Sequence, residues 1–303
     1  MPKFLIIRFS SIGDIVLTTP VVRCLRKQYP GAEIHFLTKY AYKDILANNP
    51  YINKVHTLGD SFELMLHELA IEGYDYIIDL HHNLRTLRIK RHLKKVKAFS
   101  FNKLNVEKFI LTNFKINILP NKHIVHRNLE CIASLAVVND GLGLDYFIPK
   151  IDEVKNDDIP TSHMHGYIAV VIGAALANKK LPLHKLQELC VAIGHPIILL
   201  GGKEDYEDGK AITKMDEIKI YNACGKFNLN ESADIVKKSK LVISHDTGLM
   251  HIAAALQKPI ISVWGNTVPA FGMYPYYGEK SNLQYDVVEI NKLWCRPCSK
   301  IGY

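Results

Sequence analysis

The chain has 303 residues, a net charge of +8 and 48% hydrophobic residues, which indicates a globular protein long enough for two domains. It contains no uninterrupted apolar run of about 18 residues, so we expect no membrane-spanning helix. Four of its six cysteines are scattered, a pattern typical of reduced thiols in the cytoplasm and not of a disulfide framework: Cys24, Cys131, Cys190 and Cys224.

The first half of the chain alternates predicted strands and helices. The strands are expected at Lys3–Phe9, Glu33–Leu37, Lys54–Thr57 and Tyr74–Leu80. The helices are expected from the turn at Ser10–Asp14 to about Tyr29, and then over Tyr42–Asn48 and Ser61–Glu72. Strands that alternate with helices are typical of βαβ units and predict a parallel sheet.

A basic run follows these elements. From Arg85 to Lys108 the chain has nine Lys or Arg residues and one acid, Glu107. On a helix, Arg85, Arg88, His92 and Lys95 would share one face. The run is either a solvated face or a surface for an anionic partner such as acidic lipid or a phosphorylated glycan. Regular aromatic interleaving is missing, so nucleic acid is the least favoured partner.

A polar stretch, Lys150–His165, indicates an interdomain linker, so we predict domains at residues 1–150 and 166–303. The alternation then restarts. Further strands are expected at Tyr167–Ile172, Pro196–Leu200, Leu241–Ser244 and Ile260–Trp264, and further helices at Leu183–Ile193, Asn230–Ser239 and Met250–Leu256. The pattern predicts an α/β protein with two doubly wound Rossmann-like halves and a cleft between them that the carboxyl ends of the strands face.

The candidate chemical residues of the first half follow its first strand directly. The stretch Ser10-Ser11-Ile12-Gly13-Asp14 lacks the spacing of a P-loop or of G-x-G-x-x-G, which argues against nucleoside triphosphatases and dinucleotide dehydrogenases. Asp14 would project from the tip of the strand into the cleft. Helix capping is the alternative interpretation.

In the second half, three further positions follow strands. Lys179 precedes Pro182, where a helix would begin, so its cation would lie where it can neutralise a diphosphate. Glu204 follows Gly201-Gly202 and would accept hydrogen bonds from ribose hydroxyls. Each also fits a simpler interpretation: a solvated lysine, or a turn with a helix cap.

The third position is the most informative segment, Ser244–Leu256, which runs from a buried strand through Asp246, Thr247 and Gly248 into a helix of small residues. Free backbone N–H groups and the positive end of a helix dipole attract phosphate at such a place. An ordinary N-cap is the alternative.

In this order the motifs resemble glycosyltransferase family 9, the heptosyltransferase family of lipopolysaccharide assembly, over nearly the whole chain. The motifs that carry the resemblance are Ser11-Ile12-Gly13-Asp14, Lys179-x-x-Pro182, Asp246-Thr247-Gly248-x-x-His251-x-x-Ala254-Ala255, Gly265-Asn266-Thr267 and Cys295-Arg296-Pro297-Cys298. The Asp-Thr-Gly-x-x-His element is the most specific of them.

The resemblance implies a GT-B fold and an inverting, metal-independent transferase without a cofactor. Its donor would be a nucleotide-diphosphate sugar, ADP-heptose in the best-known members, and its acceptor a lipid-linked anionic glycan at the inner membrane surface. Asp14 would be the general base, and Ser11, Gly13 and Arg85 would bind the acceptor. On the donor side, the resemblance implies that Lys179, Thr247 and Gly248 hold the diphosphate, that Asp246 contacts the sugar hydroxyls, and that His251 supports the loop or the phosphates. Glu204 is added to the donor-binding residues as the expected ribose contact.

The chain also departs from the family pattern. Leu181 stands where members often have Trp, and Ala174 and Ala175 stand where hydroxyl residues are common, which leaves the base and sugar of the donor open. Because relatives usually continue beyond Cys295-x-x-Cys298, we expect a truncated C-terminus. A nucleotide-sugar epimerase or hydrolase of GT-B shape and a catalytically silent glycan-binding relative remain alternatives.

Overall fold

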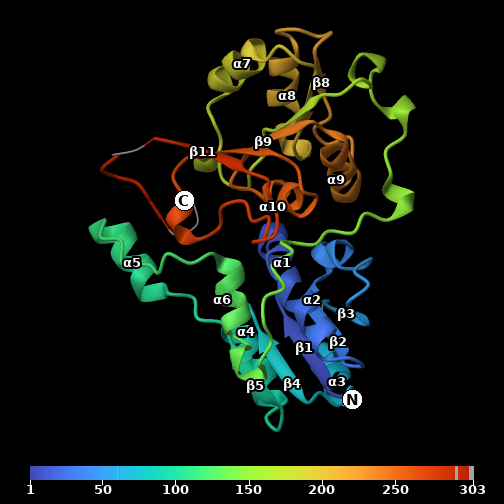
Figure 1. Ribbon diagram of the computed structural model, residues 1–303, viewed down its shortest axis with the longest axis vertical. Helices are drawn as coiled ribbons and strands as arrows, with labels where there is room; N and C mark the ends of the chain where they lie inside the picture. Colours follow the sequence, from blue (N-terminus) through green and yellow to red (C-terminus); the bar gives the residue numbers. More distant parts are fainter. Residues whose placement is uncertain (60, 291–292, 300–303) are drawn as a thin grey trace. The chain divides into compact units, whose positions relative to one another are not determined.

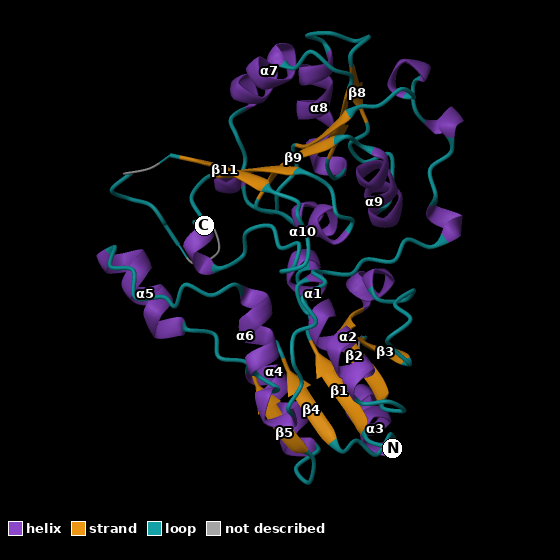
Figure 2. Ribbon diagram, in the orientation of Figure 1, coloured by secondary structure: helices purple, strands orange, loops and turns teal. Residues whose placement is uncertain are grey.

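The computed structural model describes residues 1–59, 61–290 and 293–299, and the chain forms two compact units (Figure 1). The first unit contains Met1–Leu104 and Lys122–Phe147. The second contains Asn105–Asn121 and Ile148–Tyr303. Each unit is built on its own parallel sheet with helices around it (Figure 2).

The sheet of the first unit has five parallel strands in the order β3-β2-β1-β4-β5. Apolar runs bounded by turns form them, as the sequence predicts. The strands are β1 (Lys3–Ile7), β2 (Glu33–Lys39), β3 (Lys54–Leu58), β4 (Tyr76–Asp79) and β5 (Lys97–Ser100). The direction of winding reverses between β1 and β4, which is the switch point of a Rossmann-like sheet.

The described helices of the first unit connect these strands. They are α1 (Ile12–Val16), α2 (Thr19–Gln28), the 3₁₀ helix η1 (Tyr40–Ile45), α3 (Phe62–Ile71), α4 (Leu84–His92), α6 (Ile124–Glu130) and the 3₁₀ helix η2 (Ala133–Leu135). The single helix predicted from Asp14 to Tyr29 is wrong, because Pro20 starts a separate helix α2 at its second position. The helix predicted at Tyr42–Asn48 is the shorter 3₁₀ helix η1.

One face of the first sheet carries the apolar core under α3 and α4. The core residues include Leu5, Ile7 and Leu37 from the sheet, Leu69 from α3 and Ile89 from α4, each fully buried. Complete burial of such side chains stabilises the unit by about 1.5–3 kcal/mol each. The carboxyl ends of β1 and β4 are therefore fixed by a rigid scaffold.

The sheet of the second unit has six parallel strands in the order β11-β10-β9-β6-β7-β8, with its switch point between β6 and β9. The strands are β6 (Ile168–Val171), β7 (Ile197–Leu200), β8 (Ile220–Asn222), β9 (Leu241–His245), β10 (Ile260–Trp264) and β11 (Tyr285–Glu289). The strands β6 and β7 are continuous apolar runs and β9 is apolar through Ile243, as is typical of strands in a parallel sheet with both faces covered.

The described helices of the second unit include several that the sequence pattern did not predict, among them α5 and α8. The α-helices are α5 (Asn105–Phe114), α7 (Leu183–Ala192), α8 (Tyr206–Thr213), α9 (Leu229–Lys238) and α10 (Gly248–Ala255). The 3₁₀ helices are η3 (Lys150–Asp152), η4 (Asn156–Asp158), η5 (Thr161–His163), η6 (Ala177–Lys179), η7 (Lys203–Asp205) and η8 (Pro269–Phe271). Across the described residues, no helix is long and apolar enough to cross a membrane.

The polar stretch that the sequence suggested as a linker is anchored on the second unit. The backbone N–H of Val154 donates to the Asp234 carboxylate over 2.9 Å, and Lys238 Nζ donates to the Val154 carbonyl over 2.6 Å. Val154 is itself 6% exposed. Side chains of α9 thus bind both the N–H and the C=O group of Val154. The polar segment therefore belongs to the second unit and is not a flexible linker.

Candidate functional site

Each sheet places several of the predicted site residues at its switch point. In parallel sheets, ligands bind outside the carboxyl ends of the strands where the winding reverses. Ser11, Gly13 and Asp14 follow β1 in the first unit, and Asp246, Thr247 and Gly248 follow β9 in the second. Strand order, which the sequence does not give directly, brings other segments to the same two places.

In the first unit, the Asp14 carboxylate is held by one cation and two donors. Arg8 Nη2 lies 2.5 Å from Asp14 Oδ1. The backbone N–H and the hydroxyl of Ser11, the residue before α1, donate to Asp14 Oδ2 over 3.1 and 2.8 Å. The Asp14 side chain is 26% exposed, so it remains accessible. Ser11 is exposed and Gly13 is buried.

These contacts set the charge of Asp14. Partial burial would raise the pKa of the carboxyl, but the Arg8 guanidinium and the Ser11 donors outweigh burial and hold the pKa below its usual value. Asp14 is therefore ionised at neutral pH, as a general base must be. The sequence reasoning missed Arg8, although an arginine that interrupts an apolar strand was the available signal.

The end of β4 contributes a second group to this half-site. Arg8 Nη1 donates to the Leu80 carbonyl over 2.5 Å, and the His81 ring packs edge-on against Phe9 with centroids 5.0 Å apart. Within the described residues, the buried His81 Nδ1 has no hydrogen-bond partner. Burial, with nearby Arg8 and Lys103, lowers the pKa of His81 to about 4, so this imidazole is neutral. The sequence reasoning also missed His81.

A basic pocket lies at the carboxyl edge of the same sheet. It has a volume of about 450 Å³, and its lining includes Lys39, Phe62, Arg85 and Arg88. Arg85 is exposed in α4, and Arg88 pairs with Glu63 over 2.8 Å. The pocket thus combines cations with an aromatic wall and suits an anionic ligand.

Not all basic residues of the run Arg85–Lys108 lie on one exposed helix face. Lys90 pairs with the buried Asp79 over 2.8 Å, so its charge is used inside the unit. The helix α4 ends at His92, so Lys95 does not share the helix face of Arg85 and Arg88, and the predicted four-residue face is wrong at that position. The residue at the helix C-cap, Leu93, is buried and ends the exposed face.

In the second unit, Lys179 and Asp246 meet at the switch point. Lys179 Nζ lies 2.6 Å from Asp246 Oδ2, and the Thr267 hydroxyl donates to the same oxygen over 3.0 Å. The side chains of Lys179 and Asp246 are 18% and 10% exposed. Three segments after β6, β9 and β10 therefore converge on one carboxylate oxygen.

The start of α10 lies beside this ion pair in the chain. Thr247 is the N-cap residue and is partly exposed, as is Gly248. Among the described residues, the Thr247 hydroxyl makes no capping bond to α10 and instead lies 3.2 Å from Ser244 Oγ. The first N–H groups of α10 are thus left for an anion. His251 lies inside α10 and is 1% exposed.

Close backbone packing holds the loop after β10 against the Lys179 segment. The backbone N–H of Asn266 donates to the Asn178 carbonyl over 3.3 Å. A Cβ atom on Gly265 would lie 2.5 Å from that carbonyl oxygen, so only glycine fits there. Arg296 fixes the same loop from the other side, because Nε donates to the Gly265 carbonyl over 2.6 Å and Nη2 to the Thr267 carbonyl over 2.7 Å.

Two further side chains position the segment that carries Lys179. The Leu181 backbone N–H donates to His245 Nε2 over 2.9 Å, and burial lowers the pKa of His245 to about 4, so this nitrogen stays an acceptor at neutral pH. Lys180 pairs with Asp205, which is 2% exposed. The neighbouring Glu204 is exposed on η7 at the end of β7.

The structure therefore brings together Lys179 and Asp246, and it places Asp14 with Ser11. The supporting residues Thr267, His245 and Arg296 had no predicted role, although Thr267 and Arg296 lie in motifs that the sequence singled out. The arrangement in the second unit can bind a diphosphate, and Asp14 in the first unit can accept a proton. The ligands assigned to Glu204, Gly13, Arg85 and His251 stay predictions.

Comparisons with known proteins agree with one another. Residues 64–301 match the family model described as glycosyltransferase family 9 (heptosyltransferase). The chain is 27% identical over 292 residues to lipopolysaccharide heptosyltransferase 1 of Campylobacter coli, which covers 88% of this chain and 84% of the relative.

Two solved structures show the fold. A glycosyl transferase family 9 protein from Veillonella parvula superimposes with a TM-score of 0.78 at 20% identity, over 95% of this chain and 87% of that one. The E. coli heptosyltransferase WaaC, solved with ADP-2-deoxy-2-fluoro heptose, gives 0.69 at 21% identity, over 94% of this chain and 92% of that one. The predicted fold class, GT-B with two Rossmann-like domains, is confirmed.

Proposed function

The chain belongs to glycosyltransferase family 9, the heptosyltransferase family, and on this premise we propose the reaction that it catalyses. It is a glycosyltransferase of the lipopolysaccharide heptosyltransferase type. Its donor is ADP-heptose, and its acceptor is a lipopolysaccharide-core glycan or a related one. Transfer inverts the anomeric configuration and needs no metal ion.

The Lys179–Asp246 ion pair before α10 is the observation that carries this proposal. A leaving nucleoside diphosphate develops negative charge, which a lysine and a helix N-terminus stabilise at a preorganised site. Lys179 Nζ lies 2.6 Å from Asp246, and Thr247 leaves the first turn of α10 uncapped by its side chain. The sugar of the relative's ligand, a heptose analogue on ADP, supports ADP-heptose as the donor.

Asp14 is the proposed general base. It takes the proton of the acceptor hydroxyl while that oxygen bonds to the anomeric carbon, and the bond from that carbon to the diphosphate oxygen breaks. The carboxylate is ionised and 26% exposed, so it is ready to accept a proton. Arg8 orients it and lowers its basicity.

The absence of a metal requirement is part of the proposal. Lys179 and the N-terminus of α10 provide the positive charge that a divalent cation would supply to the diphosphate. Activity should survive EDTA, and a loss that Mg²⁺ restores would contradict this part of the proposal.

The basic pocket of the first unit is the proposed contact for an anionic, lipid-linked acceptor, with the protein in the cytoplasm and reversibly bound to the inner membrane. Lys39, Arg85 and Arg88 line the pocket, and each cation near an anionic surface contributes about 1 kcal/mol. Vesicle sedimentation tests this, with Arg88, Arg91 and Lys95 replaced by Glu. Binding that persists in the variant, or on neutral vesicles, would leave the segment a solvated face.

The decisive test of the activity is incubation with a panel of nucleotide sugars, with and without a lipopolysaccharide-core acceptor. We expect the nucleoside diphosphate to be released only when ADP-heptose and acceptor are both present, and the anomeric configuration of the product to be inverted. Release without acceptor would instead indicate a hydrolase or an epimerase, and binding without turnover a silent relative.

A further inference from the structure

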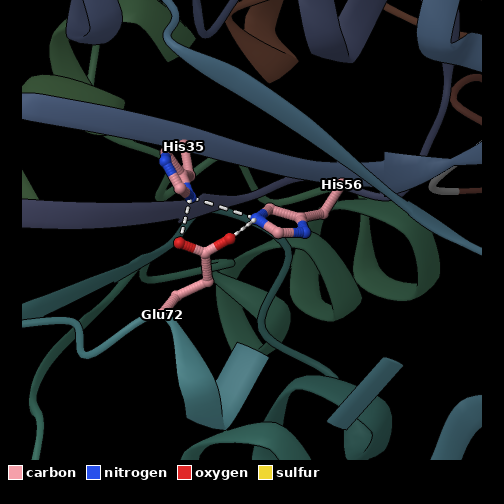
Figure 3. A group of neighbouring side chains, drawn as sticks. All are labelled: His35, His56 and Glu72. Carbon is pink, nitrogen blue, oxygen red and sulfur yellow. Dashed lines mark hydrogen bonds and ion pairs between the residues drawn. The ribbon is translucent and has the colours of Figure 1, made fainter. Parts of the chain in front are cut away.

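Two buried histidines and a partly buried glutamate lie together beside the first sheet and have no part in the proposed transfer. His35 lies on β2, His56 on β3 and Glu72 at the C-cap of α3 (Figure 3). In the register of the two strands, His35 pairs with Lys54 and Leu37 with His56, so the two imidazoles are on the same face of the sheet. Figure 3 shows the Glu72 carboxylate pointing toward both of them.

The three side chains converge within metal-binding distance. His35 is 1% and His56 5% exposed. His35 Nδ1 lies 3.0 Å from His56 Nε2, and the nearest Glu72 oxygens lie 3.8 and 3.6 Å from these nitrogens. In a tetrahedral zinc site the bonds to nitrogen are about 2.0–2.1 Å, so two nitrogen ligands lie slightly more than about 3 Å apart. The separation of the two ring nitrogens here is close to that value. The carboxylate needs to move inward by only a few tenths of an ångström.

A second carboxylate fixes the imidazole of His35 for ligation. His35 Nε2 lies 2.8 Å from Glu33 Oε1, and because a carboxylate only accepts, Nε2 carries the proton. The lone pair of Nδ1 then faces His56 and Glu72. Metal-bound histidines typically donate their other ring N–H to a carboxylate in this way. Burial also lowers the pKa of His35, and that of His56 to about 4, so both rings are neutral.

We propose that His35 Nδ1, His56 Nε2 and the Glu72 carboxylate bind one Zn²⁺ ion, which joins β2, β3 and the end of α3. Two imidazoles and one carboxylate suit zinc better than the all-oxygen ligand sets of magnesium or calcium. The Tyr74 hydroxyl lies 2.9 and 3.0 Å from the two ring nitrogens, about the separation of two ligands on a tetrahedral ion, so its oxygen can take the fourth coordination position. The role is structural, and the site is separate from Asp14 and the donor residues.

Charges around the cluster limit its affinity. Lys3 and Lys54 each lie 2.5 Å from a Glu72 oxygen, and Lys3 also lies 3.1 Å from Glu33. Both cations oppose a bound metal ion, whereas the C-terminus of α3 favours one. The Lys54 side chain is 54% exposed, so it can turn outward and leave Glu72 to a metal ion. Removal of the Lys54 charge should therefore strengthen binding.

The test uses the full chain without a purification tag, with Cys295→Ser and Cys298→Ser introduced so that these thiols bind no metal. Chelator-treated protein is titrated with Zn²⁺ against a chromophoric competitor. We expect one equivalent per chain, and affinity at least tenfold weaker in His56→Gln and in Glu72→Gln. His184→Gln, on the exposed face of α7, is the matched control and should bind like the parent. Co²⁺ should show a tetrahedral visible spectrum in the parent only.

A second variant separates a metal site from a network of ion pairs. Lys54→Met should bind Zn²⁺ more tightly than the parent, and Zn²⁺ should raise its melting temperature. If Lys54→Met binds no more tightly, or if Glu72→Gln retains the parent's affinity, the proposal is wrong. Absence of stoichiometric Zn²⁺ in the parent would show that the cluster is a metal-free polar network. Circular dichroism identifies a variant that fails to fold, in which case Glu72→Gln and Lys54→Met decide.

Discussion

Replacement of Lys179 by Met tests the donor site most directly. The substitution keeps the aliphatic stem and removes the cation that lies 2.6 Å from Asp246 Oδ2. A charge-assisted hydrogen bond to a diphosphate contributes about 1.5–3 kcal/mol, so the Kd for ADP should rise by roughly 10- to 150-fold. The effect should lie toward the upper end, because Asp246 is only 10% exposed and its negative charge would then face the diphosphate with no neighbouring lysine to neutralise it.

Because Lys179 and Asp246 form an ion pair, we expect the effects of replacing the two residues on ADP affinity not to add. In Lys179→Met combined with Asp246→Asn, the negative charge that Lys179 neutralised is also removed, so part of the ADP affinity should return. Neighbouring charges typically show coupling energies of about 0.5–3 kcal/mol in such a double-mutant cycle. Calorimetric titration with ADP gives the four affinities directly.

The adjacent lysine offers a matched control. Lys180 is 22% exposed, close to the 18% of Lys179, but it pairs with Asp205 and not with Asp246. Lys180→Met should lower the stability of the fold, because Asp205 is buried, and leave ADP affinity nearly unchanged once folded. An ADP affinity of Lys179→Met within twofold of the parent, or an equal loss in Lys180→Met, would refute the assignment.

Three further groups of residues give testable effects. Asp14→Asn should lower kcat by roughly 10²–10⁴ in steady-state assays with ADP affinity unchanged. Arg8 keeps the pKa of Asp14 below its usual value of about 4. The fall in kcat/KM that protonation of Asp14 causes at acid pH should therefore begin below about pH 4 in the parent. In Arg8→Met this fall should move to higher pH. The pKa of His245 is about 4 in the fold and about 6.5 when unfolded, so its contribution to stability is complete above pH 6.5 and declines as pH falls toward 4. His245→Leu should leave the Leu181 N–H unpaired and lower stability by about 1–3 kcal/mol in urea titrations, whereas His245→Gln, which can accept, should lose less. Arg296→Met should lower stability by roughly 1.5–3 kcal/mol and weaken ADP binding, because it frees the loop of Gly265.

Each of these expectations has an outcome that contradicts it. Asp44→Asn, an exposed carboxylate on η1, is the control for Asp14, and equal activity of the two variants would remove Asp14 from the mechanism. An acid limb that does not move in Arg8→Met would show that Arg8 does not set the charge of Asp14. Equal stability of His245→Leu and His245→Gln would mean that the bond to Leu181 contributes little, and an unchanged ADP affinity in Arg296→Met would separate Arg296 from the donor loop.

Much of the fold was predictable because its signals are local. The buried strands β6 and β7 are uninterrupted apolar runs, β9 is apolar through Ile243, and the turn residues after these strands mark where helices begin. The less regular parts were not predictable: β11 has only partly buried or exposed residues, and Pro20 divides a helix that the apolar pattern predicted as continuous. The segment 105–121 groups with the second unit through contacts distant in sequence, such as Lys115 Nζ donating to the Pro297 carbonyl over 2.8 Å.

The sequence by itself determined the fold class, the family and the positions of Asp14, Lys179 and Asp246 at strand ends, because period, turn chemistry and motif order are properties of neighbouring residues. Only the tertiary structure decided which partners these residues have. The turn between β1 and α1 brings Arg8 against Asp14, whereas strand order placed Thr267 against Asp246 and His35 beside His56. The last two pairs lie 21 residues apart in the chain, and packing of neighbouring strands, not local propensity, brings their side chains within hydrogen-bonding distance.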